Sequence, residues 1–546
     1  MVRITSSLLF AAPFASLSLA KTVTYDWDIG WVNRCPDGFC RPVIGINNQW
    51  PLPTIECDIG DTLVINIQNS LGNETTSIHY HGQYQRGTNG MDGVAMATQC
   101  PIPPGGNFTQ VFTAQVGGTH WYHSHDKAQY PDGLRAPMIV HDREYERSLG
   151  YDKEFTFSIS DWYHEQMPDM LHNYFGEGSD FGGETFMDMP MAPSSLINDT
   201  TSVILDMEPG KLYLVRMVSV SALFAHKVSF EDHEMTIVAI DGIPTNATLA
   251  NAVTIAAGQR YDVLIKGKSS PTKDYAISSL MIPAINSASG ILRYDSAATS
   301  NALPVEADLA AAIPIDDFGI APLDGTKLFS PVDQSITMRV SYTGLIERRI
   351  FLGNSTYVTP KIPTLYTALT TGSDAWNPEI YGAGANAYVI RSGQIVQIVV
   401  QNDDAIEHPM HLHGYDFQVV ARGLGSWDGD ETKLPAVPMR RDTVTTPPAG
   451  HLVIRIKTMN PGTWMFHCHM EFHVAAGMMA TIIESPDIIQ KNIVIPQAHL
   501  DMCKSQDIAT SGNCAGKTGD QILDTAECDY APPSDNFGAL ISAANV

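Results

Sequence analysis

The sequence predicts an all-β chain that folds into three sandwich domains. Short runs that alternate apolar and polar residues recur along it, for example at 62–67, 212–217 and 394–400, and Pro, Gly, Asn and Asp separate them. Such runs are typical of half-buried strands in antiparallel sandwiches, whereas convincing long amphipathic helices are scarce. At 546 residues the chain is also too long for one ordinary core.

An internal repeat sets the order of the domains. Residues 118–125 (GTHWYHSH) match residues 462–469 (GTWMFHCH) with the final His-x-His in register, and HYHG at 79–82 matches HLHG at 411–414. A similar order of strands begins near residue 208 without histidine clusters, which indicates a third copy that acts as a spacer. The predicted domains are 21–150, 151–300 and 345–500, with a linker at 301–344 and a C-terminal tail at 501–546.

The N-terminal residues predict a secreted, extracellular protein. Residues 1–20 combine Arg3, an apolar run and a small-residue cleavage site, as signal peptides do. The run is too short to span a bilayer, and no later segment supplies a membrane anchor. The net charge of −26 argues against nucleic acid or an anionic membrane as partner. Five glycosylation sequons agree with secretion: Asn73, Asn107, Asn198, Asn246 and Asn354.

Cysteine usage predicts disulfide bonds and one unpaired thiol. Of the eight cysteines, Cys468 lies within a histidine cluster, which leaves seven. Outside the cell these are expected to pair. Because seven is odd, either one thiol is free or the pairing is incomplete, and the sequence leaves the connectivity open.

The residues around Cys468 predict a copper centre. His467 and His469 flank this cysteine, His473 lies five residues beyond it and Met478 ten residues beyond it. A thiolate, two imidazoles and a distant thioether form the blue-copper ligand set. In an extended strand the side chain of Cys468 points to one face and its two neighbours point to the other. Two metal sites would then share this segment, and electrons could pass between them through the backbone.

Three further clusters of histidines extend the metal chemistry. A single His-x-His motif is weak evidence, but four clusters in one chain are strong evidence. Structural zinc is disfavoured, because it needs four ligands and paired cysteines, whereas this chain offers ten histidines and one cysteine. The additional histidines are His79, His81, His123, His125, His408, His411 and His413.

With these four motifs, nearly the whole chain resembles the multicopper oxidases, specifically the laccase-like and ferroxidase-like members found in ascomycetes. The resemblance implies three cupredoxin-like Greek-key domains and four copper ions, one of type 1, one of type 2 and two of type 3. It implies a type 1 site at His408, Cys468 and His473 with Met478 as axial ligand, a type 2 site at His79 and His411, and type 3 sites at His81, His123 and His469 and at His125, His413 and His467.

The resemblance also implies the reaction. A substrate loses one electron at the type 1 site, the electron passes through Cys468, and four such events reduce O2 to water. Asp92 and Glu471 match acidic residues near the cluster, which predicts roles in proton delivery and ligand orientation. The alternative for Asp92 is an ordinary turn residue, and the alternative for Met478 is core packing beside Met479.

Two substrate classes are compatible with these motifs. The favoured prediction is a laccase-like phenol oxidase that acts on small phenols or naphthols in pigment or secondary-metabolite biosynthesis, and the alternative is a ferroxidase. Family ferroxidases hold iron with carboxylates, and Asp404 matches one such position with Glu407 nearby. The other two positions fall on apolar residues near Met189 and Met281, although Asp188 could serve, and no membrane anchor follows.

Other interpretations of the substrate residues stay open. Laccases usually carry an acid shortly before a Leu-Ile-Asn segment, here at 196–198, but Pro193 occupies its place. Asp188, Asp404 and Glu407 are the possible substitutes. Asp404 and Glu407 could instead be solvated loop residues. A non-enzymatic copper carrier is disfavoured, because a carrier needs no trinuclear cluster. The oligomeric state does not follow from the sequence.

Overall fold

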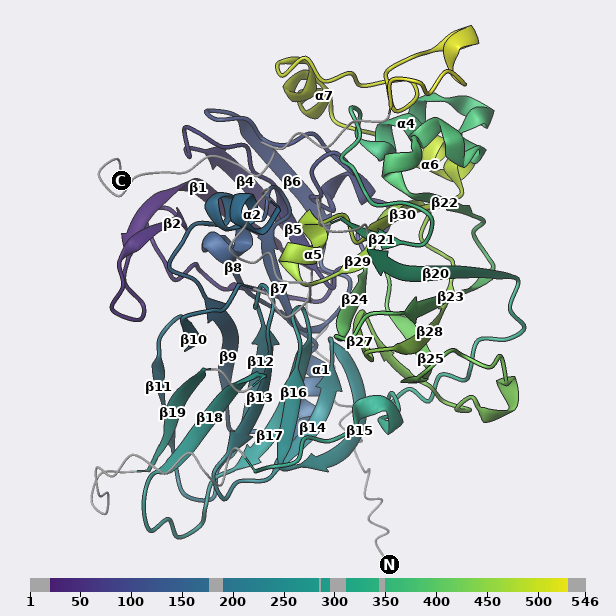
Figure 1. The fold of residues 1–546 in the computed structure, drawn as a ribbon. Helices are drawn as coiled ribbons and strands as arrows, with labels where there is room; N and C mark the ends of the chain where they lie inside the picture. Colours follow the sequence, from purple (N-terminus) through teal and green to yellow (C-terminus); the bar gives the residue numbers. More distant parts are fainter. Residues whose placement is uncertain (1–19, 176–189, 284–285, 295–310, 343–348, 529–546) are drawn as a thin grey trace, which may run out of the picture.

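Six β-sheets form the framework of the molecule in a computed structural model (Figure 1). The structure describes residues 20–175, 190–283, 286–294, 311–342 and 349–528. The sheets pair face to face into three sandwiches, so the predicted all-β class with three cupredoxin-like sandwiches is confirmed. The exact domain boundaries stay a prediction.

The first sandwich contains two four-stranded sheets. Strand β4 alternates buried and half-buried residues, so Leu63, Ile65 and Ile67 face the core that both sheets share. One sheet has the order β2 (Arg41–Ile46), β1 (Thr22–Arg34), β4 (Thr62–Asn69) and β6 (Asn107–Thr113). The other has the order β3 (Ile55–Asp58), β8 (Arg135–His141), β7 (Gly118–Ser124) and β5 (Ile78–His81).

The second sandwich follows helix α1 (Arg143–Leu149), which begins at its N-cap Asp142 and ends at Gly150. Its first sheet has the order β10 (Ser194–Ile197), β9 (Lys153–Trp162), β12 (Leu212–Ser219), β17 (Arg260–Lys266), β14 (Met235–Ile240) and β15 (Ile243–Ala250). Its second has the order β11 (Ser202–Met207), β19 (Ser287–Tyr294), β18 (Tyr275–Ile282), β13 (Ala225–Phe230) and β16 (Ala252–Ile255). Helix α2 (Met167–Phe175) follows β9, and its Tyr174 packs against Phe472 of the third sandwich.

The third sandwich includes strand β20, which lies in the segment predicted as a linker and pairs with β23 in parallel. One sheet has the order β21 (Ile350–Leu352), β20 (Gln334–Tyr342), β23 (Ile395–Asn402), β28 (Gly450–Lys457), β25 (Phe417–Leu424) and β26 (Met439–Arg441). The other has the order β22 (Ala387–Ile390), β30 (Met479–Glu484), β29 (Gly462–Cys468), β24 (His408–Leu412) and β27 (Thr443–Thr446).

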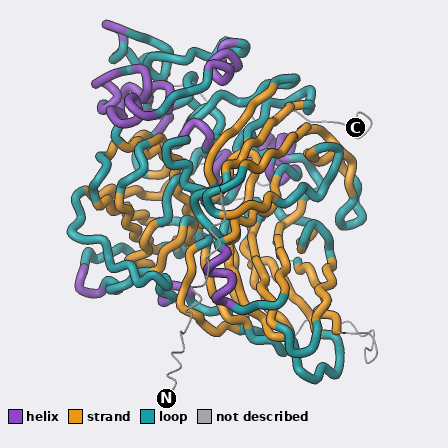
Figure 2. The backbone as a smooth tube through the Cα atoms, turned by 180° about the vertical axis from the view of Figure 1, so that it is seen from behind, coloured by secondary structure: helices purple, strands orange, loops and turns teal. Residues whose placement is uncertain are grey.

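The remaining helices are short and mostly gather at one end of the molecule, as the view from behind shows (Figure 2). They are α4 (Thr364–Thr370), α6 (Pro486–Asn492) and α7 (Gln497–Lys504), while α5 (Glu471–Ala475) lies at the junction of the sandwiches. No helix among the described residues has both the length and the apolar character needed to cross a membrane.

Three disulfides tie the chain together. Cys100 in the first sandwich bonds to Cys503 in α7, across 403 residues of sequence. The other two bonds close short loops, at Cys35–Cys40 and Cys514–Cys528. Cys57 is buried and unpaired, so the prediction of one unpaired thiol among the seven is confirmed.

Candidate metal centre

The internal repeat becomes two matched strand pairs that face each other. In the first sandwich, antiparallel β5 and β7 place His79 opposite His123. In the third sandwich, antiparallel β24 and β29 place His411 opposite His467. The two copies therefore present equivalent histidines, which the spacing of the sequence motifs predicts.

The type 1 candidates converge in one buried pocket. His408 begins β24, Cys468 ends β29 and His473 lies in α5. The sulfur of Cys468 lies 3.8 Å from Nδ1 of His408 and 3.6 Å from Nδ1 of His473, and these two nitrogens are 3.2 Å apart. None of the three side chains is exposed. Three ligand atoms thus surround one point, as a trigonal copper site requires.

Met478 and Met479 point into different surroundings. Met478 is buried in the same core cluster as Cys468, and its backbone carbonyl accepts a hydrogen bond from the Cys468 amide at 3.1 Å. Met479 instead packs beside Val94 and Met465 in a separate cluster. This arrangement favours Met478 as the axial candidate.

Of the ten candidate histidines, the eight outside the type 1 pocket form a second cluster between the first and third sandwiches. Nδ1 of His81 lies 3.2 Å from Nε2 of His469, and the Nε2 atoms of His413 and His467 are 3.1 Å apart. The ring centroids of His79 and His413 are only 4.0 Å apart. The complete set is His79, His81, His123, His125, His411, His413, His467 and His469.

Hydrogen bonds to backbone carbonyls orient the free nitrogen of His79, His123 and His411 toward the centre. His79 donates from Nδ1 to the carbonyl of Asp92 at 2.7 Å, and His411 donates from Nδ1 to the carbonyl of Asp442 at 2.9 Å. A carbonyl can only accept, so the proton is on Nδ1 and Nε2 carries a free lone pair. His123 is held in the same way by its neighbour Ser124 at 2.8 Å.

These free nitrogens fit metal ions. Nε2 of His79, His123 and His411 is buried without any hydrogen-bond partner, which is costly unless something else binds the lone pair. Two imidazole nitrogens that each lie about 2.0 Å from one ion are about 3.3 Å apart, close to the pairs described above. Burial also lowers the pKa of His473 to about 3 and of His467 to about 4, so both imidazoles are neutral, as metal ligands must be.

The two acidic candidates both reach the cluster. Asp92 is fully buried, and His413 donates from Nδ1 to its Oδ2 at 2.9 Å, so this residue has more than a turn role. Glu471 is the first residue of α5 and lines a cavity of about 710 Å³ together with His125. Burial raises the pKa of Glu471 to about 8. Both carboxyl groups therefore lie where protons can be held near the histidines.

Asp404 lies directly beside the type 1 pocket. His408 donates from Nε2 to Asp404 Oδ2 at 3.1 Å, and the hydroxyl of Tyr342 donates to the same oxygen. Burial by itself raises the pKa of the Asp404 carboxyl, but the hydrogen bonds from His408 and Tyr342 outweigh it and hold that pKa below its ordinary value. Asp404 is only 5% exposed, so it is not a solvated loop residue.

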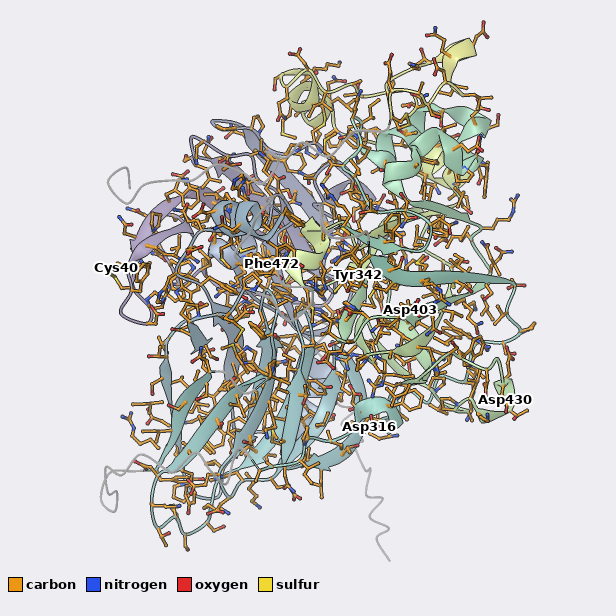
Figure 3. The ribbon with its side chains drawn as sticks, viewed as in Figure 1. Cys40, Asp316, Tyr342, Asp403, Asp430 and Phe472 are labelled. Atoms are coloured by element: carbon orange, nitrogen blue, oxygen red, sulfur yellow. A yellow bond between two sulfur atoms is a disulfide. The ribbon has the colours of Figure 1, made fainter. Side chains whose placement is uncertain are left out.

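The other substrate candidates are less informative. Glu407 is half-buried, and burial raises its pKa. Met281 is buried in the second sandwich, Pro193 is exposed, and Asp188 and Met189 lie outside the described residues. Figure 3 marks Tyr342 of β20 and Phe472 of α5 at the junction of the sandwiches, and Tyr174 of α2 lies 5.6 Å from the Phe472 ring.

Sequence reasoning missed three residues that surround the ligands. Tyr342 contacts Asp404, whereas Asp442 and Arg260 lie behind His81 and His411. The one available signal was the charged run at 440–442, which interrupts otherwise buried strands.

Comparisons with known proteins agree with this centre. Models of the multicopper oxidase family match residues 28–145, 153–297 and 357–487. The iron transport multicopper oxidase fetC of Epichloe festucae is 40% identical and the match covers 97% of this chain and 87% of that one. For FET3 of Gibberella zeae the identity is 41%, with 96% and 86% covered.

Solved structures are similar as well. The structure of Fet3p, described as a multicopper oxidase that functions in iron import, superimposes with a TM-score of 0.85 at 35% identity and covers 90% of this chain and 96% of that one. A laccase from Botrytis aclada gives a TM-score of 0.77 at 27% identity, with 90% and 93% covered.

These relatives contradict the predicted laccase-like phenol oxidase with a role in pigment or secondary-metabolite biosynthesis. That prediction is wrong, because the relatives at 40% and 41% identity are named for iron transport and Fet3p superimposes better than the laccase. The physical reason is that both substrate classes share the copper motifs, so the choice depended on a few carboxylate positions. Asp404, which favoured the alternative, is the one that the structure places against a copper-ligand candidate.

Copper is the cofactor that the histidine and cysteine clusters fit, with four ions, one of type 1, one of type 2 and two of type 3. The assignment of each ion to its ligands, as predicted from the motifs, stays a proposal that the convergence of these side chains supports. The chain therefore belongs to the multicopper oxidase family, as a copper-dependent oxidoreductase that uses O2.

Proposed function

We propose that this protein is a ferroxidase, which oxidises Fe(II) to Fe(III) beside the type 1 site and reduces O2 to water at the trinuclear cluster. The observation that carries the proposal is the hydrogen bond of 3.1 Å between Asp404 and His408. The names of the relatives, which are iron transport oxidases, support the same substrate.

The chemistry of a carboxylate suits this role. Oxygen ligands prefer the harder, more highly charged ion, and a negative charge stabilises Fe(III) more than Fe(II). Asp404 therefore makes a bound iron ion easier to oxidise. Because the same carboxylate oxygen accepts from His408, the donor and the type 1 ligand share one hydrogen-bonded path.

The protein then separates electron and proton movement. When bound, the copper ions accept electrons one at a time and deliver four of them to O2. Cys468 joins the two sites, because its neighbours His467 and His469 both belong to the histidine cluster. Asp92 orients His413, and Glu471 holds a proton at the cavity that reaches His125.

Oxygen uptake with Fe(II) tests the proposal, and Asp403 provides the matched control. Asp403 is the neighbouring carboxylate, is exposed, and pairs with Arg339 instead of His408. Asp404→Ala should raise the KM for Fe(II) or lower kcat at least tenfold, whereas Asp403→Ala should resemble the wild type. Turnover of phenols with no measurable use of Fe(II) would contradict the proposal.

A further inference from the structure

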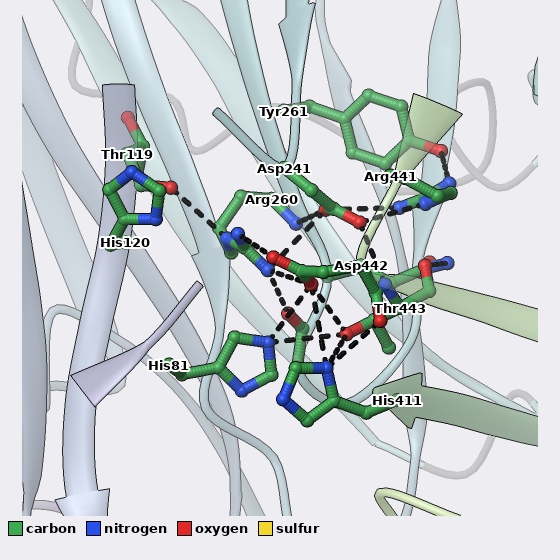
Figure 4. A network of polar contacts seen from close by, with 12 residues as sticks. His81, Thr119, His120, Asp241, Arg260, Tyr261, His411, Arg441, Asp442 and Thr443 are labelled. Atoms are coloured by element: carbon green, nitrogen blue, oxygen red, sulfur yellow. Dashed lines mark hydrogen bonds and ion pairs between the residues drawn. The ribbon is translucent and has the colours of Figure 1, made fainter. Parts of the chain in front are cut away.

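One buried carboxylate contacts a ligand candidate from each end of the chain. Oδ1 of Asp442 accepts from Nε2 of His81 at 3.1 Å, so His81 presents Nδ1 to the cluster. The backbone carbonyl of the same residue accepts from Nδ1 of His411 at 2.9 Å, so His411 presents Nε2. Figure 4 shows Asp442 between these two rings and Arg260. The orientation of both rings thus depends on where Asp442 lies.

The carboxylate is held by an arginine from the second sandwich. Arg260 begins β17 and is fully buried. Its Nη1 donates to Oδ1 of Asp442 at 2.6 Å and its Nη2 donates to Oδ2 at 2.5 Å. A planar guanidinium that binds both oxygens fixes the plane of the carboxylate as well as its position.

Arg260 is itself fixed by carbonyls on two sides. Nε donates to the carbonyl of Thr119 in β7 at 3.0 Å, and Nη1 donates to the carbonyl of Gly258 at 3.0 Å. The guanidinium therefore joins the first sandwich, the second sandwich and Asp442. A lysine has the same charge but lacks the fork geometry for these four bonds.

Two glycines allow this close approach. Gly82 follows His81 at φ +91°, and a Cβ there would lie 2.6 Å from Nη2 of Arg260. Gly258 has φ +82°, and a Cβ there would lie 2.7 Å from Cδ2 of His469. The second sandwich thus contacts the cluster histidines with bare backbone, at a position where any side chain would collide.

A second arginine holds the segment that carries Asp442. Arg441 donates to Asp241 at 2.9 Å and to Asp317 at 2.5 Å. Asp241 also accepts from the backbone amides of Arg260 at 2.8 Å and of Thr443 at 3.2 Å. Because these charges are buried and paired, removal of one partner leaves the other uncompensated. The network fixes β26 and β27 against β17.

Asp442 acts through the histidines and is not itself a ligand. One ligand atom from each of Asp442, His81 and His411 lies within 4.8 Å of the other two, a spacing that could hold a metal ion. However, both oxygens of Asp442 are occupied by the Arg260 guanidinium, whose positive charge excludes a second cation at that place.

We propose that the second sandwich, which contributes no copper-ligand candidate among its described residues, positions the trinuclear cluster through Arg260 and Asp442. Arg260 fixes Asp442, and Asp442 sets the nitrogen that His81 and His411 present to copper. Both are positioning residues. The proposal concerns the cluster alone and holds whichever substrate reduces the type 1 site.

Arg260→Lys tests the proposal, with Arg216→Lys as its matched control. Arg216 lies on β12, the neighbour of β17 in the same sheet, is equally buried, and pairs with Glu146 at 2.6 Å and Glu154 at 2.9 Å. The readouts are the type 2 copper signal in electron paramagnetic resonance, the blue absorbance of the type 1 site, and copper retention against a graded chelator.

Loss of ligand orientation typically weakens metal binding by about 10- to 100-fold. Arg260→Lys should therefore release cluster copper at about 10- to 100-fold lower chelator concentration and change the type 2 signal, while the blue absorbance remains. Arg216→Lys should match the wild type in all three readouts. Equal copper loss in both variants, with the blue absorbance kept, would overturn the proposal. Parallel loss of the blue absorbance in Arg260→Lys would mean that this variant does not fold, and Thr443→Val then decides.

Thr443→Val keeps the test decisive if Arg260→Lys does not fold. The Thr443 hydroxyl donates to Oδ1 of Asp442 at 2.9 Å and lies 3.1 Å from Nδ1 of His411. Valine has nearly the same shape without the hydroxyl. The variant should change the type 2 signal and release cluster copper at a lower chelator concentration than the wild type, while the blue absorbance remains. A wild-type signal and wild-type copper retention in Thr443→Val would overturn the proposal.

Discussion

His413 donates from Nδ1 to Asp92 Oδ2 at 2.9 Å, although 321 residues of sequence separate the two. This bond joins the first sandwich to the third directly behind the cluster. It fixes which nitrogen His413 presents to copper, and it leaves a carboxylate where O2 reduction consumes protons.

Asp92→Asn should slow the reoxidation of the reduced enzyme by O2, by about 10² or more as expected for loss of a positioned proton donor. The type 1 site does not contact Asp92, so its blue absorbance should be unchanged. Stopped-flow mixing of reduced protein with O2 measures the rate. Reoxidation at the wild-type rate would remove Asp92 from the mechanism.

Glu471 predicts a pH limit on O2 reduction. Because burial raises the pKa of Glu471 to about 8, its carboxyl keeps a proton at neutral pH and loses it as the pH rises through that value. The positive charge of bound copper lowers this pKa. The rate of reoxidation should therefore decrease as the pH rises, with a midpoint at or below pH 8. Glu471→Gln should abolish this fall and reduce the rate at pH 6. A variant that keeps the wild-type pH profile would contradict the role.

Met478 predicts the potential of the type 1 site. Replacement of a thioether by an aliphatic group removes a ligand that stabilises oxidised copper. Met478→Leu should raise the potential by on the order of 100 mV, where 59 mV corresponds to a tenfold change for one electron. Met479→Leu is the control, because Met479 packs beside Met465 in a separate cluster. Redox titration of the blue absorbance measures both, and an equal shift in the two variants would reject the assignment.

The sequons should differ in whether they carry a glycan when the chain is secreted. The side-chain amide of Asn198 accepts from the Ser158 amide at 2.8 Å and donates to the Thr156 carbonyl at 2.9 Å, so it is engaged in the fold. Asn107, Asn246 and Asn354 are exposed. Peptide mass spectrometry should find glycans at the exposed sites and none at Asn198. A glycan at Asn198 would show that modification precedes folding of this turn.

The local motifs carried most of the information that the sequence offered. His467 and Cys468 are the last two residues of β29 and His469 follows directly, so the alternation of side chains separates the two metal sites. The repeated motif also predicts two copies of one metal-bearing sandwich, and the strand registers agree, because His79 faces His123 as His411 faces His467. Ligand types at fixed spacing depend on backbone geometry that the sequence determines locally.

The surroundings of the ligands could not be predicted in the same way. Arg260 and Asp442 are 182 residues apart, and only the packing of the second sandwich against the third brings them together. Tyr342 lies in β20, a strand of nine residues that falls within the expected linker because it follows a segment rich in Pro and Asp. The substrate prediction failed for the same reason, since it depended on such tertiary neighbours and not on the copper motifs.

The most direct test of the proposed function is the rate at which Fe(II) reduces the type 1 site without O2. The loss of blue absorbance after rapid anaerobic mixing measures this rate. This reaction isolates electron transfer from the substrate, because O2 is absent. Asp404 should make the wild type react rapidly and with saturation, Asp404→Ala should be slower by at least tenfold, and Asp403→Ala should match the wild type. Reduction by Fe(II) that is slower than reduction by a phenol and unchanged in Asp404→Ala would contradict the ferroxidase account.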